Sequence, residues 1–413
     1  MQSANTSAGT GHLGGPTPGP GTTLSKQSKA GFVSRALART KLARNIVSMT
    51  FNPHRKPTNL ILYVTSYCGA KCPMCFVKGL NTGPEPTMDQ IREVSAFYPK
   101  PMSGVALTGG DPFLRKELPE IAKLFWDNNR VEAVHIPSNG LIPETHCKAV
   151  RKILETTGCE VTVAISLDAT GATYDEIRGV KGNFPRTMET YDRLAKMTDE
   201  FPRLKIAVNT VVSNMSYPTI SDLIQFVRTR MPKVWMHDFD LIRGEPLDPL
   251  VTLPPMEDLL KLRPLLRENY DYYLNRMGAA LKKYQLDLNL MVLQKNQQIP
   301  KCKAAETYLV VDQYANVAFC ELTAPVGNLN KARVEDIWKS PIANARRESI
   351  HRGDCFCTHG CFQPLNILYT PLQSAIPVLK EAIMGDVKLA PELSAASAKP
   401  QGAKPAVSSW PPS

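Results

Sequence analysis

Residues 60–76 read LILYVTSYCGAKCPMCF, and this stretch decides the fold. Leu60–Thr65 is a short apolar run typical of a buried strand. Cys68, Cys72 and Cys75 follow it, and three cysteines on one loop can hold three corners of a four-iron four-sulfur (4Fe-4S) cluster. No fourth ligand lies nearby, so one iron stays open for a small molecule with an amine and a carboxylate. The alternative is a zinc site completed by a distant residue, although zinc favours paired cysteines.

Similar strand-like runs recur downstream, with helical patterns between them. In residues 114–125, for example, apolar side chains return at helical spacing. Strands that alternate with helices predict a parallel sheet. Six units in about 190 residues are too few for a full eight-unit barrel of about 250 residues, so we expect a partial (β/α)6 TIM-like barrel. The six predicted strands are Leu60–Thr65, Val105–Thr108, Val131–Ile136, Val161–Ser166, Ile206–Val212 and Val234–Leu241.

The cysteine loop resembles the signature of the radical S-adenosylmethionine (SAM) superfamily. In that family the open iron of the cluster binds SAM. One departure is Met74, which stands where the family usually has an aromatic residue. Methionine is also large and apolar, so it suits the same shielding role. The resemblance covers residues 58–245.

Further motifs at strand ends extend the resemblance. Gly109, Gly110 and Asp111 resemble the family's Gly-Gly-Glu-Pro motif, which binds the amino group of SAM. Glycines allow close backbone approach and a carboxylate pairs with ammonium, but Asp is one methylene shorter than Glu. Ser138 and Asn139 resemble the family's Thr-Asn-Gly turn, although a simple Asn-Gly turn explains them equally well.

The fourth and fifth strands supply the other SAM-binding candidates. Ser166, Asp168 and Arg178 resemble the Ser-Leu-Asp … Ile-Arg-Gly pattern of the SPASM/twitch branch. In that branch the Ser and the Arg contact the ribose and carboxylate side of SAM. A hydroxyl suits ribose, and a guanidinium suits a carboxylate. Asn209 on the fifth strand is a weaker candidate.

A second group of five cysteines lies near the C-terminus. An apolar hairpin pattern separates the first two, and the amphipathic segment Val334–Trp338 precedes the last three. This order resembles the small α+β twitch or SPASM extension, which implies an auxiliary 4Fe-4S cluster. A cubane takes four thiolates; we expect Cys302, Cys320 and Cys361 with Cys355 or Cys357, while His359 among them leaves a structural zinc knuckle open.

The resemblance implies an enzyme that cleaves SAM reductively to a 5′-deoxyadenosyl radical, which takes hydrogen from a substrate. We expect oxidation of a small molecule assisted by the auxiliary cluster, with electrons from flavodoxin or ferredoxin. The alternatives are a peptide or protein maturase and a non-catalytic iron–sulfur scaffold. His237, Asp238 and Asp240 end the sixth strand and are candidates for a base.

Composition limits the remaining classes. The 413 residues are 43% hydrophobic, enough for a core, and show neither a secretory signal nor a transmembrane run. The net charge of +11 is concentrated in residues 1–57, which hold eight Lys and Arg and no acid, so we expect no nucleic-acid partner. Clustered cysteines without a signal predict a reducing, cytoplasmic location.

The chain divides by pattern into six segments. The basic leader should pack on the main domain; docking on an anionic surface, or a transit peptide, is the alternative. The predicted segments are a disordered arm (1–30), a basic leader helix (31–57), the barrel (58–245), a helical connector (246–300), the auxiliary cluster domain (301–370) and a disordered tail (385–413).

Overall fold

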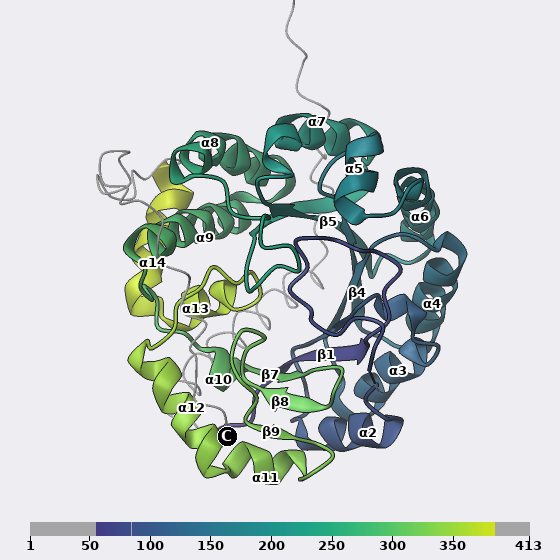
Figure 1. The fold of residues 1–413 in the computed structure, drawn as a ribbon, viewed down its shortest axis with the longest axis vertical. Coiled ribbons are helices and arrows are strands. Elements are labelled where there is room, and N and C mark those ends of the chain that lie inside the picture. The colour runs from purple at the N-terminus through teal and green to yellow at the C-terminus, as the bar shows by residue number, and fades with distance from the viewer. Residues whose placement is uncertain (1–54, 84, 385–413) are drawn as a thin grey trace, which may run out of the picture. The chain divides into compact units, whose positions relative to one another are not determined.

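One mixed sheet organises the protein. The structure is a computed structural model and describes residues 55–83 and 85–384. The described strands follow the order β6-β5-β4-β3-β2-β1-β7-β8-β9, and β1 to β6 are parallel (Figure 1). This arrangement confirms the predicted α/β partial barrel, with the third strand two residues later than expected. The barrel strands are β1 (Asn59–Thr65), β2 (Gly104–Gly109), β3 (Ala133–Ser138), β4 (Glu160–Ser166), β5 (Leu204–Val212) and β6 (Val234–Leu241).

Helices between the strands cover one face of this sheet (Figure 1). The predicted helix over 114–125 begins later, at Leu118. Pro112 starts a short 3-10 turn, η1 (Pro112–Leu114), in which the Asp111 side chain accepts the Phe113 N–H, so Leu114 is not part of the helix. The covering helices are α2 (Met88–Phe97), α3 (Leu118–Asn129), α4 (Pro143–Thr156), α5 (Gly171–Arg178), α6 (Asn183–Glu200) and α7 (Ile220–Arg230), with the 3-10 turn η2 (Tyr217–Thr219) before α7.

Alternate residues of each strand point to opposite faces. Val134 and Ile136 are fully buried on the helix side, whereas His135 between them is solvent-exposed. In β2 the same alternation leaves Ala106 partly accessible between buried Val105 and Leu107. The inner face is therefore accessible at β3, whereas at β1 and β2 Ile61 and Ala106 pack in a second apolar cluster with Val310 and Phe362.

The predicted connector contains two long helices, α8 (Met256–Tyr273) and α9 (Arg276–Lys295). Leu259 and Leu266 of α8 share a buried cluster with Phe239 and Leu241 of β6. These helices therefore cover the last barrel strand as α2 to α7 cover the others.

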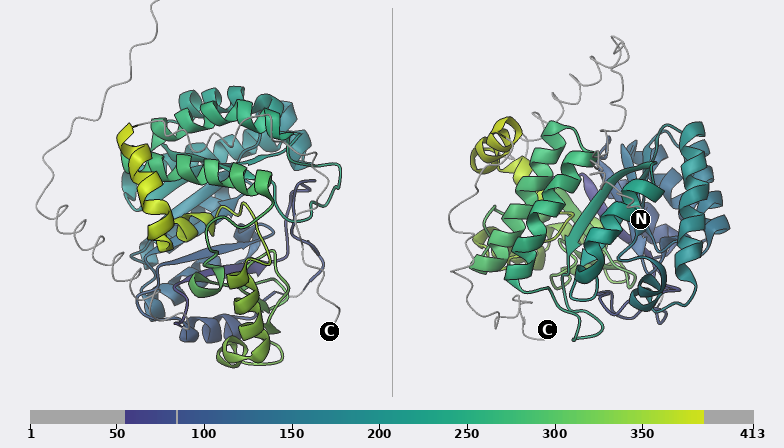
Figure 2. Two further views of the ribbon diagram at one scale, coloured as in Figure 1. Left: turned by 90° about the vertical axis from the view of Figure 1, so that its left-hand side faces the viewer. Right: turned by 90° about the horizontal axis from the view of Figure 1, so that it is seen from above.

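The C-terminal extension continues the barrel sheet. The predicted hairpin is present as β7 (Tyr308–Val311) and β8 (Asn316–Ala318), followed by β9 (Gly327–Asn328). The sequence did not predict that β7 pairs in parallel with β1, which joins the two regions in one sheet. The helices of the extension are α10 (Ala304–Thr307), α11 (Val334–Lys339), α12 (Pro341–Arg352), α13 (Gln363–Tyr369) and α14 (Pro371–Met384) (Figure 2).

Some predictions fall on other parts of the chain. The arm 1–30, most of the leader helix 31–57 and the tail 385–413 lie outside the described residues. The domain boundaries stay predictions. In residues 55–83 and 85–384, no helix combines the length and apolarity that crossing a membrane requires.

Candidate iron–sulfur and SAM site

The first cysteine loop is held by hydrogen bonds to the end of helix α5 and to the chain that follows the loop. The Lys71 N–H donates to the Arg178 carbonyl at 2.9 Å. The Asn81 side chain accepts the Cys68 N–H at 3.0 Å and donates to the Cys68 carbonyl at 3.3 Å. Burial raises the pKa of the Cys68 thiol to about 11, and the neighbouring Asp111, Cys72 and Cys75 add to the rise. The three thiols therefore lie close enough to repel one another as thiolates.

The Gly109–Gly110 turn packs directly on this loop. Gly110 N–H donates to the Thr65 carbonyl at 3.0 Å, and Asp111 N–H donates to the Tyr67 carbonyl at 2.7 Å. A Cβ on Gly110 would lie 2.2 Å from the Tyr67 carbonyl oxygen, and Gly109 has a φ of +135°. No other residue fits either position without moving the cysteine loop.

Asp111 and the next strand end border the same loop. The Asp111 carboxylate is buried, which raises its pKa, while His146 and Asn139 oppose the rise. The Asn139 amide also points toward the Cys68 sulfur at 3.9 Å, and its Oδ1 accepts the Leu141 N–H. Ser138 instead uses its hydroxyl to accept the Gly140 N–H at 3.0 Å, within the turn.

Arg178 connects the fourth strand end to the cysteines. Its Nη2 lies 2.5 Å from Asp168 Oδ2, and its Nη1 donates to the Cys72 sulfur at 3.5 Å. Burial opposes the charged form, but Asp168 and Cys72 outweigh it and raise the pKa of Arg178 above its usual value. Its Nε is buried without a hydrogen-bond partner. Ser166 contributes only its carbonyl, which accepts from the Tyr174 hydroxyl at 3.0 Å.

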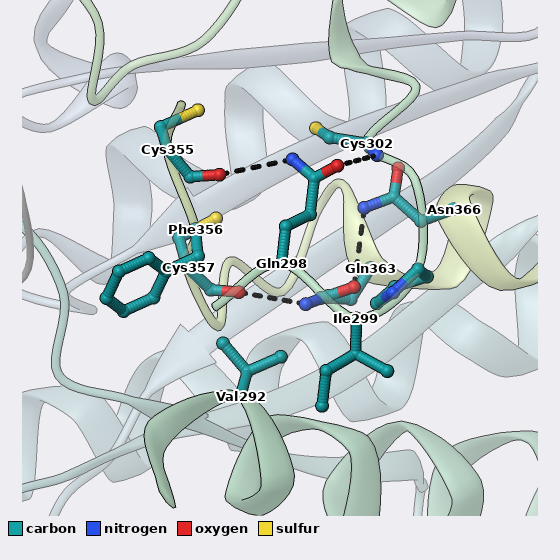
Figure 3. A pocket seen from close by; sticks show the side chains of 10 residues that line it. Val292, Gln298, Ile299, Cys302, Cys355, Phe356, Cys357, Gln363 and Asn366 are labelled. Atoms are coloured by element: carbon teal, nitrogen blue, oxygen red, sulfur yellow. Dashed lines mark hydrogen bonds between the residues drawn. The ribbon is translucent and has the colours of Figure 1, made fainter. Parts of the chain in front are cut away.

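Four of the five C-terminal cysteines form a second group. Burial raises the pKa of Cys302 to about 12, and Cys357 and Cys355 add to the rise; Cys320 is raised in the same way beside Cys357 and Cys302. Three of these thiols line a pocket of about 280 Å³, open mouth included (Figure 3). The lining residues are Val292, Gln298, Ile299, Pro300, Cys302, Cys355, Phe356, Cys357, Gln363 and Asn366.

Side-chain amides fix the backbone of this pocket. Gln298 accepts the Cys302 N–H at 3.1 Å and donates to the Cys355 carbonyl at 3.1 Å, so it ties two segments together (Figure 3). Gln363 donates to the Cys357 carbonyl at 2.8 Å. These amides thus fix the positions of the backbone segments that carry the thiols of the pocket.

Cys361 lies in different surroundings. Its pKa is raised to about 12 by burial and by Glu321 and Asp240, while Arg243 and Lys282 lower it. A Cβ on the preceding Gly360 would lie 2.0 Å from the Asp240 carboxylate, so this turn presses against the end of β6. Cys361 also packs against the apolar cluster that contains Cys320 and contacts Cys302, so its place among the auxiliary ligands stays a prediction.

Charged groups that sequence analysis missed surround Cys361. Glu321 accepts hydrogen bonds from Tyr63 and interacts with His359 through its other oxygen. Burial opposes ionisation, but His359, Arg243 and Tyr63 lower the pKa of Glu321 to about 2. The Arg243 guanidinium lies 5.1 Å from the centre of the Phe76 ring, beside Cys75. The only signal in the sequence is that Glu321 directly follows Cys320.

The candidate bases at the end of β6 divide between two faces. Asp240 accepts from Asn209 at 3.1 Å and lies 3.4 Å from Arg243, and Asp238 pairs with Lys282 and the Tyr270 hydroxyl on the same face. His237 points the other way: it is fully buried in the core, hydrogen-bonds Thr210 at 2.8 Å, and burial lowers its pKa to about 3. The expectation that His237 supplies a base at this site is therefore at odds with its position.

The residues fit the predicted cofactors by donor chemistry. Each of the two cysteine groups offers sulfur ligands for iron. The first group also has the Arg178 Nε beside it, which is buried without a hydrogen-bond partner. In the described part of the chain no three His, Cys, Asp or Glu side chains are spaced to hold one metal ion. A cubane makes a different demand, because each cysteine binds a separate iron.

Comparison with known proteins identifies the class. The radical SAM superfamily model matches residues 62–226, and that of the SPASM iron–sulfur cluster-binding domain matches residues 302–362. The fold and the two thiol groups are thus those of an iron–sulfur barrel protein. The chain belongs to the radical SAM superfamily and to its SPASM/twitch branch. Its cofactors are a 4Fe-4S cluster, SAM and auxiliary iron–sulfur.

Individual relatives are distant. GTP 3′,8-cyclase of Synechococcus elongatus is 26% identical over 176 residues, 41% of this chain and 51% of the relative. The sporulation killing factor maturation protein SkfB of Bacillus subtilis is 26% identical over 174 residues, 41% of this chain and 39% of the relative. Streptococcus suis SuiB, solved with its precursor peptide SuiA, shares the fold with a TM-score of 0.52 at 14% identity over 79% of this chain and 74% of SuiB. The chain spans about half or less of these curated relatives.

Proposed function

We propose that this chain is an oxidoreductase that cleaves SAM reductively and takes a hydrogen atom from a small polar molecule. The observation that carries the proposal is the convergence of strand ends on the first cysteine loop. Gly110 packs on Tyr67, Asn139 points at Cys68, and Arg178 donates to Cys72. Residues from β2, β3 and the segment after β4 thus meet at one set of thiols.

The site residues are assigned from these contacts. Cys68, Cys72 and Cys75 hold the cluster that binds SAM, and the residues beside them face SAM. When bound, these groups supply an electron that splits SAM into methionine and a 5′-deoxyadenosyl radical. Gly109, Gly110 and Asp111 receive the ammonium side, and Arg178 the carboxylate side, because a buried guanidinium nitrogen remains free there. Ser138, Asn139, Ser166, Asp168 and Asn209 complete the set of proposed SAM contacts and supports.

The charged inner face supports a small polar substrate. Tyr63, Asp240, Arg243 and Glu321 lie between the loop around Phe76 and the extension. In a two-electron oxidation the 5′-deoxyadenosyl radical would take a hydrogen atom from the substrate, the auxiliary cluster would accept the remaining electron, and a carboxylate would accept the proton. The Glu321 carboxylate, ionised because its pKa is lowered to about 2, lies where it orients polar groups, and Asp238 and Asp240 are the candidate proton acceptors.

The auxiliary cluster is assigned to Cys302, Cys320, Cys355 and Cys357. Cys357 and Cys355 raise the pKa of Cys302, and Cys357 and Cys302 raise that of Cys320, whereas the largest charge effects on Cys361 come from Glu321, Arg243 and Asp240. The alternative set is Cys302, Cys320 and Cys361 with Cys355 or Cys357. The electron donor is proposed to be a flavodoxin or ferredoxin, and the compartment the cytoplasm.

A peptide maturase is the second candidate. SkfB is named a maturation protein, and SuiB, whose fold this chain shares, was solved with a precursor peptide. A non-catalytic scaffold is the third, and a turnover assay distinguishes it.

The decisive experiment measures SAM cleavage. Anaerobically reconstituted, reduced protein should convert SAM to 5′-deoxyadenosine, and Cys72→Ala should abolish the conversion. Cys147→Ala is the matched control, because Cys147 belongs to neither thiol group. Filled clusters without 5′-deoxyadenosine would favour the scaffold. Deuterium transfer into 5′-deoxyadenosine from labelled metabolites or labelled peptides would then separate the two enzymatic candidates.

A further inference from the structure

A buried histidine lies behind Asp111, the carboxylate that is assigned to the ammonium side of SAM. His146 is fully buried in the first turn of α4, and its Nε2 lies 3.8 Å from Asp111 Oδ2. That distance is too long for a hydrogen bond but short enough for an ion pair. Within the part of the chain that the structure describes, His146 Nε2 has no hydrogen-bond partner. A buried polar atom in this state requires an explanation.

The imidazole ring of His146 is fixed by two contacts. Its Nδ1 lies 2.5 Å from the Ile142 carbonyl oxygen, which also accepts the His146 backbone N–H at 3.1 Å. The face of the ring stacks on Phe113, with the ring centres 4.2 Å apart and an angle of 30° between the planes. A carbonyl oxygen only accepts hydrogen bonds, so Nδ1 carries a proton. Nε2 is therefore the nitrogen that faces the carboxylate.

The Asp111 carboxylate is held by the same short segment. Its Oδ1 accepts the Phe113 N–H at 3.1 Å, and the Asn139 amide stabilises its ionised form from the next strand end. Phe113 thus contacts the carboxylate through its backbone and the imidazole through its ring. Asp111, Phe113 and His146 therefore form a closed triangle of contacts, in which the direction of the carboxylate depends on the position of the imidazole.

The length of Asp111 explains why such a support is needed. Asp111 stands where the related motif has glutamate, and its side chain is one methylene shorter. A shorter side chain reaches a ligand from a narrower range of directions, and small errors of position are costly at a reacting site. A carboxylate has about four acceptor positions, so Phe113 and Asn139 leave room for both His146 and an ammonium group.

The charges of the pair agree with this role. Burial raises the pKa of Asp111 and lowers that of His146, and each of the two groups opposes the shift of the other. Each group therefore favours the charged form of its neighbour. An apolar side chain at position 146 would leave the buried carboxylate without this interaction.

From this geometry we propose that His146 is a positioning residue, which orients the Asp111 carboxylate toward the ammonium group of SAM and so compensates for the missing methylene. The inference rests on the proposed function, because it takes Asp111 as a contact of SAM. His146 is fully buried behind the carboxylate, so it acts through Asp111 and not on SAM itself. Its loss should therefore weaken the binding of the ammonium group and leave the rest of the SAM site unchanged.

Equilibrium binding of two ligands to the reconstituted full chain tests the proposal. One ligand is SAM, and the other is the SAM analogue in which hydrogen replaces the α-amino group. His146→Phe keeps an aromatic ring against Phe113 and removes both ring nitrogens. We expect it to raise the Kd for SAM at least about tenfold, the lower end of what loss of a supporting group costs, and to leave the Kd for the analogue unchanged. His146→Gln places an amide N–H near the position of Nε2 and should restore the Kd for SAM to within about threefold of wild type.

Lys148→Gln is the matched control, because Lys148 lies on the same helix with its side chain 75% exposed, and this variant should bind both ligands like wild type. Iron content and thermal melting should be the same for all variants. If His146→Phe differs in either, His146→Asn takes its place, since it keeps an amide for the Ile142 carbonyl and is too short to reach Asp111.

The proposal is overturned if removal of Nε2 leaves the Kd for SAM unchanged. It is also overturned if removal weakens both ligands equally, because the ring would then have only a structural role, or if His146→Gln binds SAM as weakly as His146→Phe. Wild type that binds SAM without forming 5′-deoxyadenosine would contradict the proposed function alone, since the comparison of Kd values needs no turnover.

Discussion

The two cysteine groups of this protein are built in opposite ways. Cys68, Cys72 and Cys75 lie on one loop directly after β1, so chain connectivity alone keeps them together. The second group gathers cysteines from before α10, after β8 and after α12, and needs the tertiary fold to assemble. A local group can be identified from spacing, whereas a dispersed group requires the structure to say which thiols meet.

The two groups also differ in how their surroundings hold them. Backbone carbonyls of the loop receive N–H groups from the Gly109–Gly110 turn. In the second group, side-chain amides of Gln298 and Gln363 bind the backbone next to the cysteines. The shape of the first site therefore depends on glycine at positions 109 and 110. The second site depends on which cysteines the fold brings together. Variants at both kinds of position test this difference.

Gly110→Ala should have the largest effect. Its Cβ would lie 2.2 Å from the Tyr67 carbonyl, so the loop must shift. A displacement of about 1 Å at a reacting site costs about 100-fold or more, and we expect SAM cleavage below detection. The 5′-deoxyadenosine assay measures this. Gly104→Ala is the control, since its Cβ would meet only ordinary contacts at 3.4 Å. Normal SAM cleavage by Gly110→Ala would show that a Cβ at position 110 does not displace the cysteine loop.

Cys357→Ser should remove the auxiliary cluster and leave the first one. Iron and sulfide should fall by about half, because a cubane holds four of each. Cys361→Ser should keep the full content, since the largest charge effects on Cys361 come from Glu321, Arg243 and Asp240. Metal analysis and electron paramagnetic resonance measure both. Loss of iron from Cys361→Ser, with Cys357→Ser intact, would restore Cys361 as a ligand.

Arg178→Lys should weaken SAM binding about 10- to 100-fold, the range seen when supports of metal sites are changed. Lysine cannot reach both Asp168 and Cys72 with a planar fork. Equilibrium binding of SAM to reconstituted protein measures the loss. Arg151→Lys, on the exposed pair with Glu200, should change nothing. If both substitutions weakened SAM binding equally, the planar guanidinium of Arg178 would not be what SAM binding requires.

The same contrast explains what could be predicted from the sequence. All six barrel strands were predicted because each is an apolar run between turns, and the cysteine loop because its spacing is local. The start of α3 was wrong because Leu114 fits the apolar spacing although Pro112 has begun a separate turn. A periodic pattern reports which residues are apolar and says nothing about where a turn interrupts them.

The polar groups of the inner face were missed for another reason. The Tyr63 hydroxyl reaches Glu321 across 258 positions, and no pattern in either segment points to the other. The pairing of β7 with β1 brings them together, and that register depends on the whole fold. His237 shows the converse: it follows the strand period, so its burial opposite Asp238 and Asp240 could have been predicted from alternation alone.

Glu321→Gln should have the smallest effect, seen as a pH dependence of stability. The pKa of Glu321 falls from 4.5 to about 2 on folding, since His359 and Arg243 outweigh burial. A lowered carboxyl pKa stabilises the folded state above pH 4.5, and this contribution is lost as pH falls toward 2. At pH 7 it amounts to about 3 kcal/mol at most, and at pH 4 it is smaller by about 1 kcal/mol.

Urea unfolding of wild type and Glu321→Gln at pH 7 and pH 4 measures this difference. The gap in unfolding free energy should narrow at the lower pH, because the unfolded wild-type carboxyl then takes up a proton that the folded one does not. Glu257→Gln is the control, since the Glu257 side chain is 73% exposed. The difference in unfolding free energy between this variant and wild type should be the same at pH 7 and pH 4. A constant difference for Glu321→Gln would mean that folding leaves the pKa of Glu321 unchanged, and a difference that widens at pH 4 would mean that the carboxyl is protonated in the folded protein. Glu321 would then donate a hydrogen bond to His359, and the second cysteine region would present a neutral side chain to the substrate where we infer an anion.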